Sequence, residues 1–215
     1  MIIAHISPRT GGKTTSVGWH AHALYERGYP VTAFEADYSR QLTEWDECAG
    51  GFPFPVQQQA SPMFFKNVPP TMAPGQIGVV DCGHAEDHRS IVQSVLRVTD
   101  VAILNTAPTT ADIDRIDRLP MRALIEEVAV LRPDGNPPPT WVLLNRTTAG
   151  AKATNDYRAY LTDGGWNVFT TTIPGLQRYA QSMLRPVTAA KGSAYDELVT
   201  EMTDRGLLPT IGDQR

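Results

Sequence analysis

The chain has 215 residues, of which 41% are apolar and 20% are charged, and its formal net charge is −4. This composition is typical of a water-soluble globular protein, and the length suits one domain with a full core. The negative net charge excludes a surface built as a whole to hold nucleic acid, so any such binding needs a local basic patch.

Cysteine usage and targeting patterns indicate the compartment. Cys48 and Cys82 lie far apart and show no pairing pattern, which is typical of a reducing environment. No secretory leader pattern opens the sequence, and no apolar run approaches the length that spans a bilayer. We therefore expect a cytoplasmic protein that does not bind membranes.

The most informative motif lies near the start of the sequence. A short apolar run leads into a turn that contains Gly11 and Gly12, and Lys13 and Thr14 then open a helical segment. A phosphate-binding loop is built in this way. Loop amides and the helix N-terminus face the anion, the lysine reaches the β- and γ-phosphates, and the threonine hydroxyl holds Mg²⁺.

The loop pattern G-x-x-x-x-G-K-[ST] is incomplete, because Ser7 stands where its first glycine belongs. The alternative is an ordinary strand, turn and helix. The position of the motif between a strand pattern and a helix pattern favours the phosphate-binding loop. Its predicted ligand contacts are Thr10, Gly11, Gly12, Lys13, Thr14 and Thr15.

After the loop, apolar residues recur at helical spacing over residues 14–27, and Gly28 is the expected stop. A β-type run over residues 31–34 follows and ends in Glu35 and Asp37. Carboxylates at the end of a parallel strand lie at the sheet edge where open α/β folds bind ligands. Residues 46–76 are irregular, with a short strand expected near 54–57 and a helical turn near 63–67.

The next apolar strand ends in Asp81, with Gly83 two residues later. This pattern is typical of a Walker B strand and switch II, in which the aspartate holds Mg²⁺ through water and the glycine amide senses the γ-phosphate. Cys82, His84 and His88 offer three zinc ligands at most, so we do not expect a zinc site.

The remaining sequence alternates regularly between strand and helix patterns. The expected strands cover 101–105, 141–145 and 166–170, and the expected helices cover 111–130, with a break near Pro120, 152–162, 175–184 and 193–205. This alternation predicts an α/β fold, with a mostly parallel sheet and helices on both faces. We expect one domain over residues 1–215.

Several motifs occur in a fixed order along the chain. They are Gly12-Lys13-Thr14-Thr15, Arg27-Gly28-Tyr29-Pro30-Val31, Glu35-Ala36-Asp37, Asp81-Cys82-Gly83, the segment 106–113, Leu144-Asn145-Arg146 and Ile173-Pro174. Together they resemble the ParA/MinD family of deviant-Walker P-loop ATPases, which position DNA or other cargo. The resemblance covers most of the chain and implies a P-loop NTPase fold.

The resemblance implies ATP and Mg²⁺ as ligands. Lys13 would neutralise phosphoryl charge and Asp37 would orient the attacking water. Asn145 and Pro174 would contact the base. The implied metal ligands are Thr14, Asp81 and Asp37.

The resemblance also implies partners. An ATP-bound homodimer would bind DNA non-specifically on the nucleoid, and a ParB-like adaptor would stimulate slow hydrolysis. The candidate DNA contacts are Arg158, Arg178 and Arg185, in the C-terminal third where relatives carry their DNA-facing basic residues. The alternative for each is a solvated helix residue.

The loop departs from the family pattern. Pro8 stands at the position of the signature lysine, which in the family reaches across a nucleotide-sandwiched dimer. The neighbouring Arg9 has a longer reach and a guanidinium that can hold a phosphate with two hydrogen bonds. We therefore hypothesise that Arg9 replaces this lysine, and we count it with Lys13 and Asp37 as a predicted catalytic residue. The alternative is that Arg9 faces solvent.

Three other functions are alternatives. A MinD-like membrane-cycling ATPase needs a basic amphipathic C-terminal helix, whereas residues 201–209 are acidic and contain proline. A nucleotide-binding scaffold that has lost catalysis would explain the degenerate loop. A small-molecule kinase or synthetase is less favoured, since we find no second substrate motif.

Overall fold

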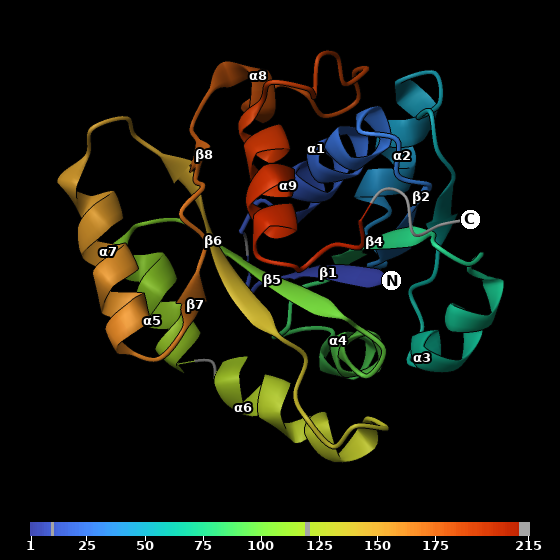
Figure 1. Cartoon of the computed structure of the whole chain (residues 1–215), viewed down its shortest axis with the longest axis horizontal. Helices are drawn as coiled ribbons and strands as arrows, with labels where there is room; N and C mark the ends of the chain where they lie inside the picture. Colours follow the sequence, from blue (N-terminus) through green and yellow to red (C-terminus); the bar gives the residue numbers. More distant parts are fainter. Residues whose placement is uncertain (10, 119–120, 211–215) are drawn as a thin grey trace.

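The computed structural model describes residues 1–9, 11–118 and 121–210. In these residues eight strands form a sheet in the order β3-β2-β4-β1-β5-β6-β7, with β8 paired to β6 (Figure 1). Every described pairing is parallel. The strands are β1 (Ile2–Ile6), β2 (Val31–Ala36), β3 (Val56–Gln58), β4 (Ile77–Cys82), β5 (Val101–Thr106), β6 (Thr140–Thr147), β7 (Asn167–Val168) and β8 (Ile173–Pro174).

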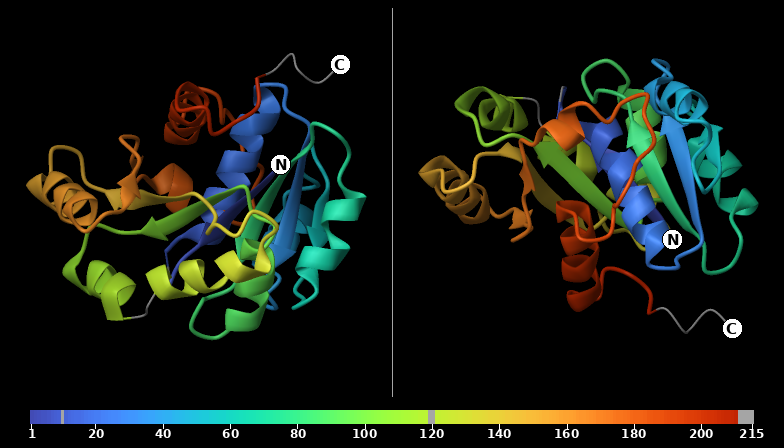
Figure 2. Two further views of the ribbon diagram at one scale, coloured as in Figure 1. Left: turned by 60° about the horizontal axis from the view of Figure 1, so that its bottom comes forward. Right: turned by 90° about the horizontal axis from the view of Figure 1, so that it is seen from above.

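Helices cover both faces of the sheet (Figures 1 and 2). On one face lie α1 (Lys13–Glu26), α2 (Gln41–Cys48), α8 (Gln177–Ala180) and α9 (Ala194–Asp204). On the other lie α3 (Phe64–Asn67), α4 (Arg89–Leu96), α5 (Thr110–Arg118), α6 (Met121–Glu127) and α7 (Lys152–Asp163). Two short 3₁₀ helices, η1 (Pro69–Thr71) and η2 (Ala129–Leu131), complete the described elements. None of the described helices is long and apolar enough to cross a bilayer.

The α/β fold with a parallel sheet between two helical layers confirms the sequence prediction. The central strands are apolar on both faces because side chains alternate along a strand and helices bury each side. In β1, Ile3 packs into the core under α1, whereas Ala4 packs into the core on the α4 side. The helices predicted near residues 14–27, 152–162 and 193–205 match α1, α7 and α9 closely.

Under α1, the sheet changes from apolar to polar toward the carboxyl ends of its strands. Five neighbouring strands each place one buried polar residue on this face, in the order Glu35, Asp81, His5, Asn105 and Asn145. The register pairs Glu35 with Asp81 and Asp81 with His5. We call these five residues the polar row. The N-terminal part of α1 lies above this edge of the sheet (Figure 2).

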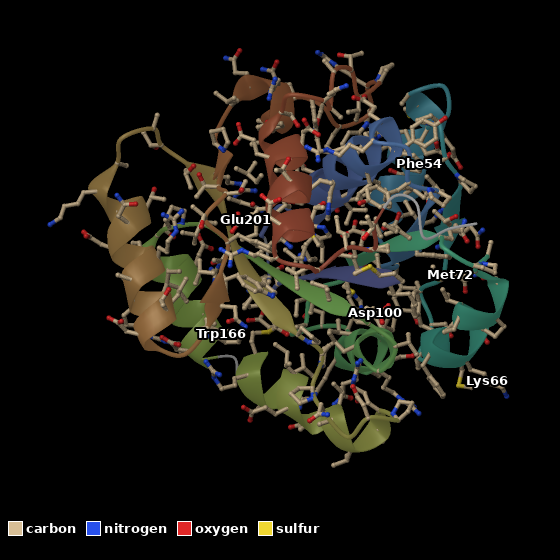
Figure 3. The ribbon with its side chains drawn as sticks, in the orientation of Figure 1. Phe54, Lys66, Met72, Asp100, Trp166 and Glu201 are labelled. Atoms are coloured by element: carbon tan, nitrogen blue, oxygen red, sulfur yellow. The ribbon has the colours of Figure 1, made fainter. Side chains whose placement is uncertain are left out.

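Two predicted elements are shorter than expected. The helix predicted over residues 175–184 forms only the four residues of α8, and Leu184 adopts a left-handed φ of 64°, which helices do not tolerate. The strand predicted over 166–170 forms only β7. The Phe169 amide still donates to the Val142 carbonyl of β6, at 3.0 Å, but the amides of Thr170 and Thr171 donate to the Glu201 carboxylate of α9, at 2.8 and 2.7 Å. Glu201 is labelled in Figure 3.

Two helices were not predicted. The helix α2 buries only Leu42 and Trp45, so its apolar pattern is too short to stand out. The helix α4 buries Ile91, Val92 and Val95 against the sheet, at a spacing that indicates a helix. The predicted break near Pro120 lies outside the described residues.

The last helix packs directly on the first. The Trp19 ring of α1 contacts the rings of Tyr179 and Tyr195, with centroids 4.9 and 6.3 Å away. An ion pair between Arg27 and Asp196 joins the other end of α1 to α9. The position of α1 therefore depends on residues that lie far away in the sequence.

Candidate functional site

The loop between β1 and α1 has the close packing of a phosphate-binding loop. Gly12 has a left-handed φ of 73° and caps α1. A Cβ atom on Gly11 would lie 2.5 Å from the backbone oxygen of Asn105, so only glycine fits there. The Lys13 ammonium donates to Ser7 Oγ at 2.9 Å and to the Arg9 carbonyl at 3.1 Å. Lys13 is thus held along the loop, at the N-terminus of α1.

Asp81 supplies a buried acceptor beside this loop. Neither of its carboxylate oxygens makes a hydrogen bond of normal geometry with a described residue, although the Thr14 hydroxyl lies near enough to favour the ionised form and lower the carboxyl pKa. Burial raises the pKa of Asp81 to about 7, against the opposing effect of the Lys13 charge. Its neighbour Glu35 accepts instead from the Thr43 amide at 2.8 Å, at the start of α2. Glu35 Oε1 also lacks a partner among the described residues, but Asp81 is the carboxylate of the polar row with both oxygens left free for a ligand.

Asp37 lies where β2 ends, beside the predicted switch segment. Its Oδ1 accepts from the Ser39 amide at 3.1 Å and lies 3.7 Å from the Nε2 of His88. A Cβ on Gly83 would be 3.3 Å from the Asp37 carboxyl carbon. The carboxylate predicted to orient water and the glycine predicted to sense phosphate are thus neighbours.

Two cavities meet at the loop. One, of about 300 Å³, is lined by Gly11, Gly12, Lys13, Thr14, Thr15, Asp37, Ser39, Gln41, His84, Arg146 and Met183. The other, of about 410 Å³, is lined by Gly12, Thr15, Asn145, Arg146, Ile173, Pro174, Gly175, Leu176, Tyr179, Ala180 and Tyr195. We call them the phosphate cavity and the base cavity. They share Gly12, Thr15 and Arg146, and together they have room for a nucleotide.

The oxygen atoms that the described residues offer as metal ligands fit a magnesium ion that is bound together with a nucleotide. No cluster of three or more His, Cys, Asp or Glu residues suited to a metal occurs in the described part of the chain. Magnesium commonly takes one or two carboxylates and completes its shell with phosphate oxygens and water. The Thr14 hydroxyl, in the phosphate cavity, and the unpartnered Asp81 carboxylate would supply the protein ligands.

The cavities bring together most of the predicted ligand contacts. Gly11, Gly12, Lys13, Thr14, Thr15 and Asp37 line the phosphate cavity, and Asn145 and Pro174 line the base cavity. The predicted contact from Thr10 lies outside the described residues. Arg9 lines neither cavity; its side chain is 56% exposed and lies 3.7 Å from Glu86.

The three predicted DNA contacts lie in different surroundings. Arg158 donates to the Thr170 carbonyl at 2.9 Å. The guanidinium of Arg178 lies 4.8 Å from the ring centroid of Tyr179 and donates to its hydroxyl at 2.8 Å. Arg185 is exposed.

Sequence reasoning missed several residues of the site. Arg146, which follows Asn145, lines both cavities and adopts a left-handed φ of 55°. His84 and Met183 line the phosphate cavity from segments distant in the sequence. His5 and Asn105 of the polar row also went unnoticed, because each lies at or near the end of a strand that is otherwise mostly apolar.

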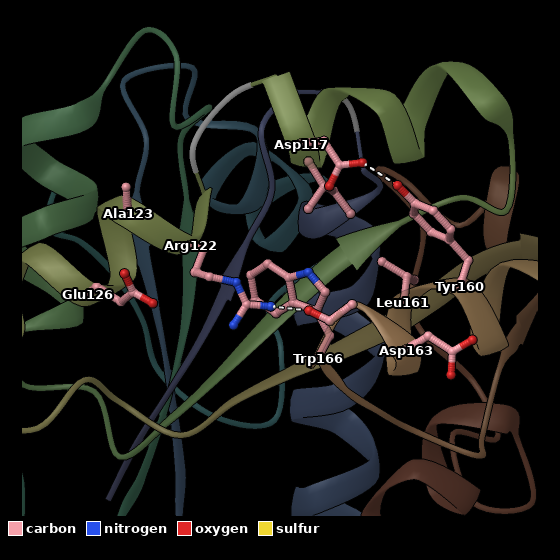
Figure 4. Close-up of a pocket in the computed structure, with 10 residues that line it drawn as sticks. Asp117, Arg122, Ala123, Glu126, Tyr160, Leu161, Asp163 and Trp166 are labelled. Atoms are coloured by element: carbon pink, nitrogen blue, oxygen red, sulfur yellow. Dashed lines mark hydrogen bonds between the residues drawn. The ribbon is translucent and has the colours of Figure 1, made fainter.

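A larger cavity, of about 560 Å³, lies on the opposite face of the sheet, between α5, α6 and α7 (Figure 4). The Arg122 guanidinium lies 4.4 Å from the Trp166 ring centroid and donates to the Gly164 carbonyl at 2.8 Å. The Tyr160 hydroxyl donates to Asp117 at 2.8 Å. Because several of its polar groups already have partners, this cavity offers less for ligand recognition than the cavities at the loop.

The parallel strand order, the glycine loop between β1 and α1 and the ligand cavities at the carboxyl edge define a P-loop NTPase fold of the ParA/MinD type. Comparison with protein-family models and with curated proteins gives no match. Solved structures do match in fold. A variant of McdA from Cyanothece in complex with ATP has a TM-score of 0.73 at 11% identity, over 98% of this chain and 97% of that chain.

Two further structures have a TM-score of 0.70. A putative plasmid partition protein from Borrelia burgdorferi, bound to AMPPNP, is 11% identical over 95% of this chain and 98% of its own. Cobyrinic acid a,c-diamide synthase from Mycobacterium smegmatis, with bound ADP and magnesium, is 14% identical over 98% of each chain. The fold is therefore shared by proteins of different function.

Replacing Asp81 with Asn tests the burial of this carboxyl group. A carboxyl whose pKa is raised by folding holds its proton more tightly when folded, so the parent loses stability as pH rises from about 4 toward about 7. We therefore compare the free energy of unfolding of Asp81→Asn with that of the parent at pH 5 and at pH 8. We expect the difference, variant minus parent, to be larger at pH 8 by roughly 1–3 kcal/mol. Urea unfolding at both pH values measures this change. The control is Asp163→Asn, on the exposed end of α7, and equal pH dependence in Asp81→Asn and the parent would contradict the prediction.

Proposed function

We propose that this chain is a ParA-like ATPase. It binds ATP with Mg²⁺, dimerises, binds DNA non-specifically as the dimer, and is released by slow hydrolysis that a ParB-like adaptor stimulates. The observation that carries the proposal is the buried, unpartnered Asp81 carboxylate beside Lys13 and a glycine loop, with a second cavity for the base. The fold shared with a plasmid partition protein supports it.

In this proposal the residues of the chain act mainly by charge and position. The Lys13 ammonium leaves Ser7 Oγ and the Arg9 carbonyl to contact the β- and γ-phosphates, while the α1 N-terminus faces the phosphate charge. Thr14 and Asp81, with Asp37 as the third predicted ligand, would hold the magnesium ion, which would supply positive charge against the phosphate. Asp37 orients the attacking water.

The synthase fold neighbour makes a small-molecule synthetase the main competing function. Such an enzyme would hydrolyse ATP only together with its second substrate. A partition ATPase would instead turn over slowly alone and faster with DNA and its adaptor. Phosphate release by the protein with ATP and Mg²⁺, with and without random duplex DNA, tests the partition function, and no release under either condition would contradict it in favour of a synthetase or a scaffold.

Two substitutions separate binding from turnover. Lys13→Ala removes an ammonium that lines the phosphate cavity, so we expect affinity for a fluorescent ATP analogue to fall at least about 100-fold. Asp37→Ala should keep this affinity but lower phosphate release by about 100-fold or more. Glu47→Ala, an exposed carboxylate on α2, is the control. Full-strength binding by Lys13→Ala would contradict the phosphate-binding role of the loop.

Arg185→Ala is the cleanest test of DNA binding, because Arg158 and Arg178 also make local contacts within the fold. We expect ATP-dependent retention of random duplex DNA that weakens steeply with salt, and a salt slope lower by about 1 in the variant. A gel mobility shift at several salt concentrations measures both. The control is Arg118→Ala, on the opposite face of the sheet, and the absence of ATP-dependent retention by the parent would contradict DNA binding.

Arg9 would replace the signature lysine across the dimer. In a hydrolysis-deficient Asp37→Ala background with ATP, we expect Arg9→Ala to reduce the dimer fraction in sizing chromatography, because the phosphate charge between subunits loses a cation. Arg118→Ala in the same background is the matched control. An unchanged dimer fraction together with unchanged ATP affinity would mean that Arg9 has neither role.

A further inference from the structure

A buried chain of hydrogen bonds runs behind the phosphate-binding loop. It joins His20 of α1 to His5 of β1, Asn105 of β5 and Asn145 of β6, and all four residues are at most 3% exposed. His5 Nε2 lies 3.0 Å from His20 Nδ1, and Asn105 Nδ2 lies 3.1 Å from His5 Nδ1. Asn145 Nδ2 donates to Asn105 Oδ1 at 3.2 Å. The three strands lie side by side under α1 (Figure 1).

The amide of Asn145 has a defined orientation. Its Nδ2 faces the Gly11 carbonyl at 2.9 Å, Ser16 Oγ at 3.2 Å and Asn105 Oδ1 at 3.2 Å. A backbone carbonyl only accepts hydrogen bonds, so the amino end of Asn145 must lie on this side. Its Oδ1 is buried and has no partner among the described residues, and Asn145 lines the base cavity. Asn145 can therefore offer a ligand in the base cavity a hydrogen-bond acceptor, its Oδ1, but no donor.

The orientation of Asn105 is defined in the same way. Its Nδ2 donates to the Ile103 carbonyl at 3.0 Å, which leaves Oδ1 on the side of Asn145. The same Nδ2 faces His5 Nδ1, which accepts only when the proton of the neutral ring is on Nε2. His5 Nε2 then donates to His20 Nδ1.

Burial keeps both imidazoles neutral. It lowers the pKa of His5 to about 4 and that of His20 well below its usual value. The donors of the chain thus all point the same way, from Asn145 through Asn105 and His5 to His20. Turning the Asn105 amide would place its amino group against that of Asn145 and break this order.

We propose that Asn105, held by His5, is a positioning residue that acts together with the Gly11 carbonyl to give the base cavity its selectivity. By keeping Oδ1 of Asn145 free as an acceptor, it selects a base edge with an amino donor, such as position 6 of adenine, over a keto oxygen at that position. This inference rests on the proposed nucleotide-binding function. It assigns roles to two strand residues that do not line the base cavity.

The expected selectivity arises from a hydrogen bond that Asn145 Oδ1 forms with an amino group and cannot form with a keto oxygen. A keto oxygen opposite Asn145 Oδ1 would place two acceptors together in a buried site, where neither finds a donor. ATP and inosine triphosphate probe this effect, because position 6 carries an amino group in ATP and a keto oxygen in inosine triphosphate, and the adjacent N1 changes from an acceptor to a donor. We expect the parent to bind ATP about 10- to 100-fold more tightly than inosine triphosphate.

The test is the ratio of the two dissociation constants, measured by displacement of a fluorescent ATP analogue in the presence of Mg²⁺. In Asn105→Leu, Asn145 keeps the Gly11 carbonyl but loses the Asn105 acceptor for its amino group, so we expect the ratio to fall by at least about threefold. We expect His5→Leu to lower the ratio less, because the Ile103 carbonyl still orients Asn105. Thr99→Val, which removes a buried hydroxyl bonded to the Val95 carbonyl elsewhere in the fold, should leave the ratio unchanged.

Selectivity distinguishes positioning from a structural role. A structural role would weaken both nucleotides equally and keep the ratio, and that result in Asn105→Leu overturns the inference. If Asn105→Leu fails to fold, the affinities of the parent protein for ATP and inosine triphosphate still test the inference. Equal affinity of the parent for both nucleotides overturns the inference while the proposed function stands. Binding of neither nucleotide overturns the proposed function and the inference with it.

Discussion

The site depends on the contact between Gly11 and the backbone carbonyl of Asn105. The loop lies so close to β5 that a single added carbon at Gly11 would be 2.5 Å from the Asn105 oxygen. This approach places the carbonyl of Gly11 where the Asn145 amino group can donate to it, and it directs the chain into α1 at Gly12. One close backbone packing contact therefore connects the phosphate-binding loop to the strands that line the base cavity.

Burial of opposite charges determines the electrostatics of the site. Burial lowers the pKa of Lys13 and raises that of Asp81, and each charge opposes the shift of the other. Glu35 and Asp37 add further negative charge near Asp81. A small region with one buried cation and several carboxylates suits a ligand that brings both phosphate and a divalent cation, because each component meets its opposite charge.

Sequence reasoning identified the parts of the site that lie within one motif. Gly12, Lys13 and Thr14 were predictable because a strand, a turn and a helix follow one another directly, and Asp81 because it ends an apolar strand. His84 was not, since only the tertiary fold brings its segment to the phosphate cavity. The segment of Arg146 was recognised through Asn145, but its left-handed φ of 55° and its place in both cavities were not predicted. The helix α2 escaped notice because it buries only two residues, so its apolar pattern is short.

His5 and Asn105 show a signal that was present but unused. In β1 and β5 they continue, at every second residue, the face on which Ile3 and Ile103 are buried under α1. A polar residue at such a position has to find a hydrogen-bond partner inside the fold. Alternation therefore indicated that these side chains point inward, but the partners depend on the order of the strands, which the sequence pattern leaves open.

The packing of α9 on α1 has a consequence for the order of events in folding. The hydroxyl of Ser16, one turn into α1, forms a hydrogen bond with the hydroxyl of Tyr195, which lies 179 residues later in the sequence. During synthesis the ribosome delivers the first helix long before the last one, so the apolar side of α1 lacks these contacts until almost all of the described chain has emerged. Early in translation α1 therefore exposes Trp19 to solvent or to chaperones. The contacts that join the N-terminal end of α1, next to the phosphate-binding loop, to α9 form only when the late C-terminal segment docks.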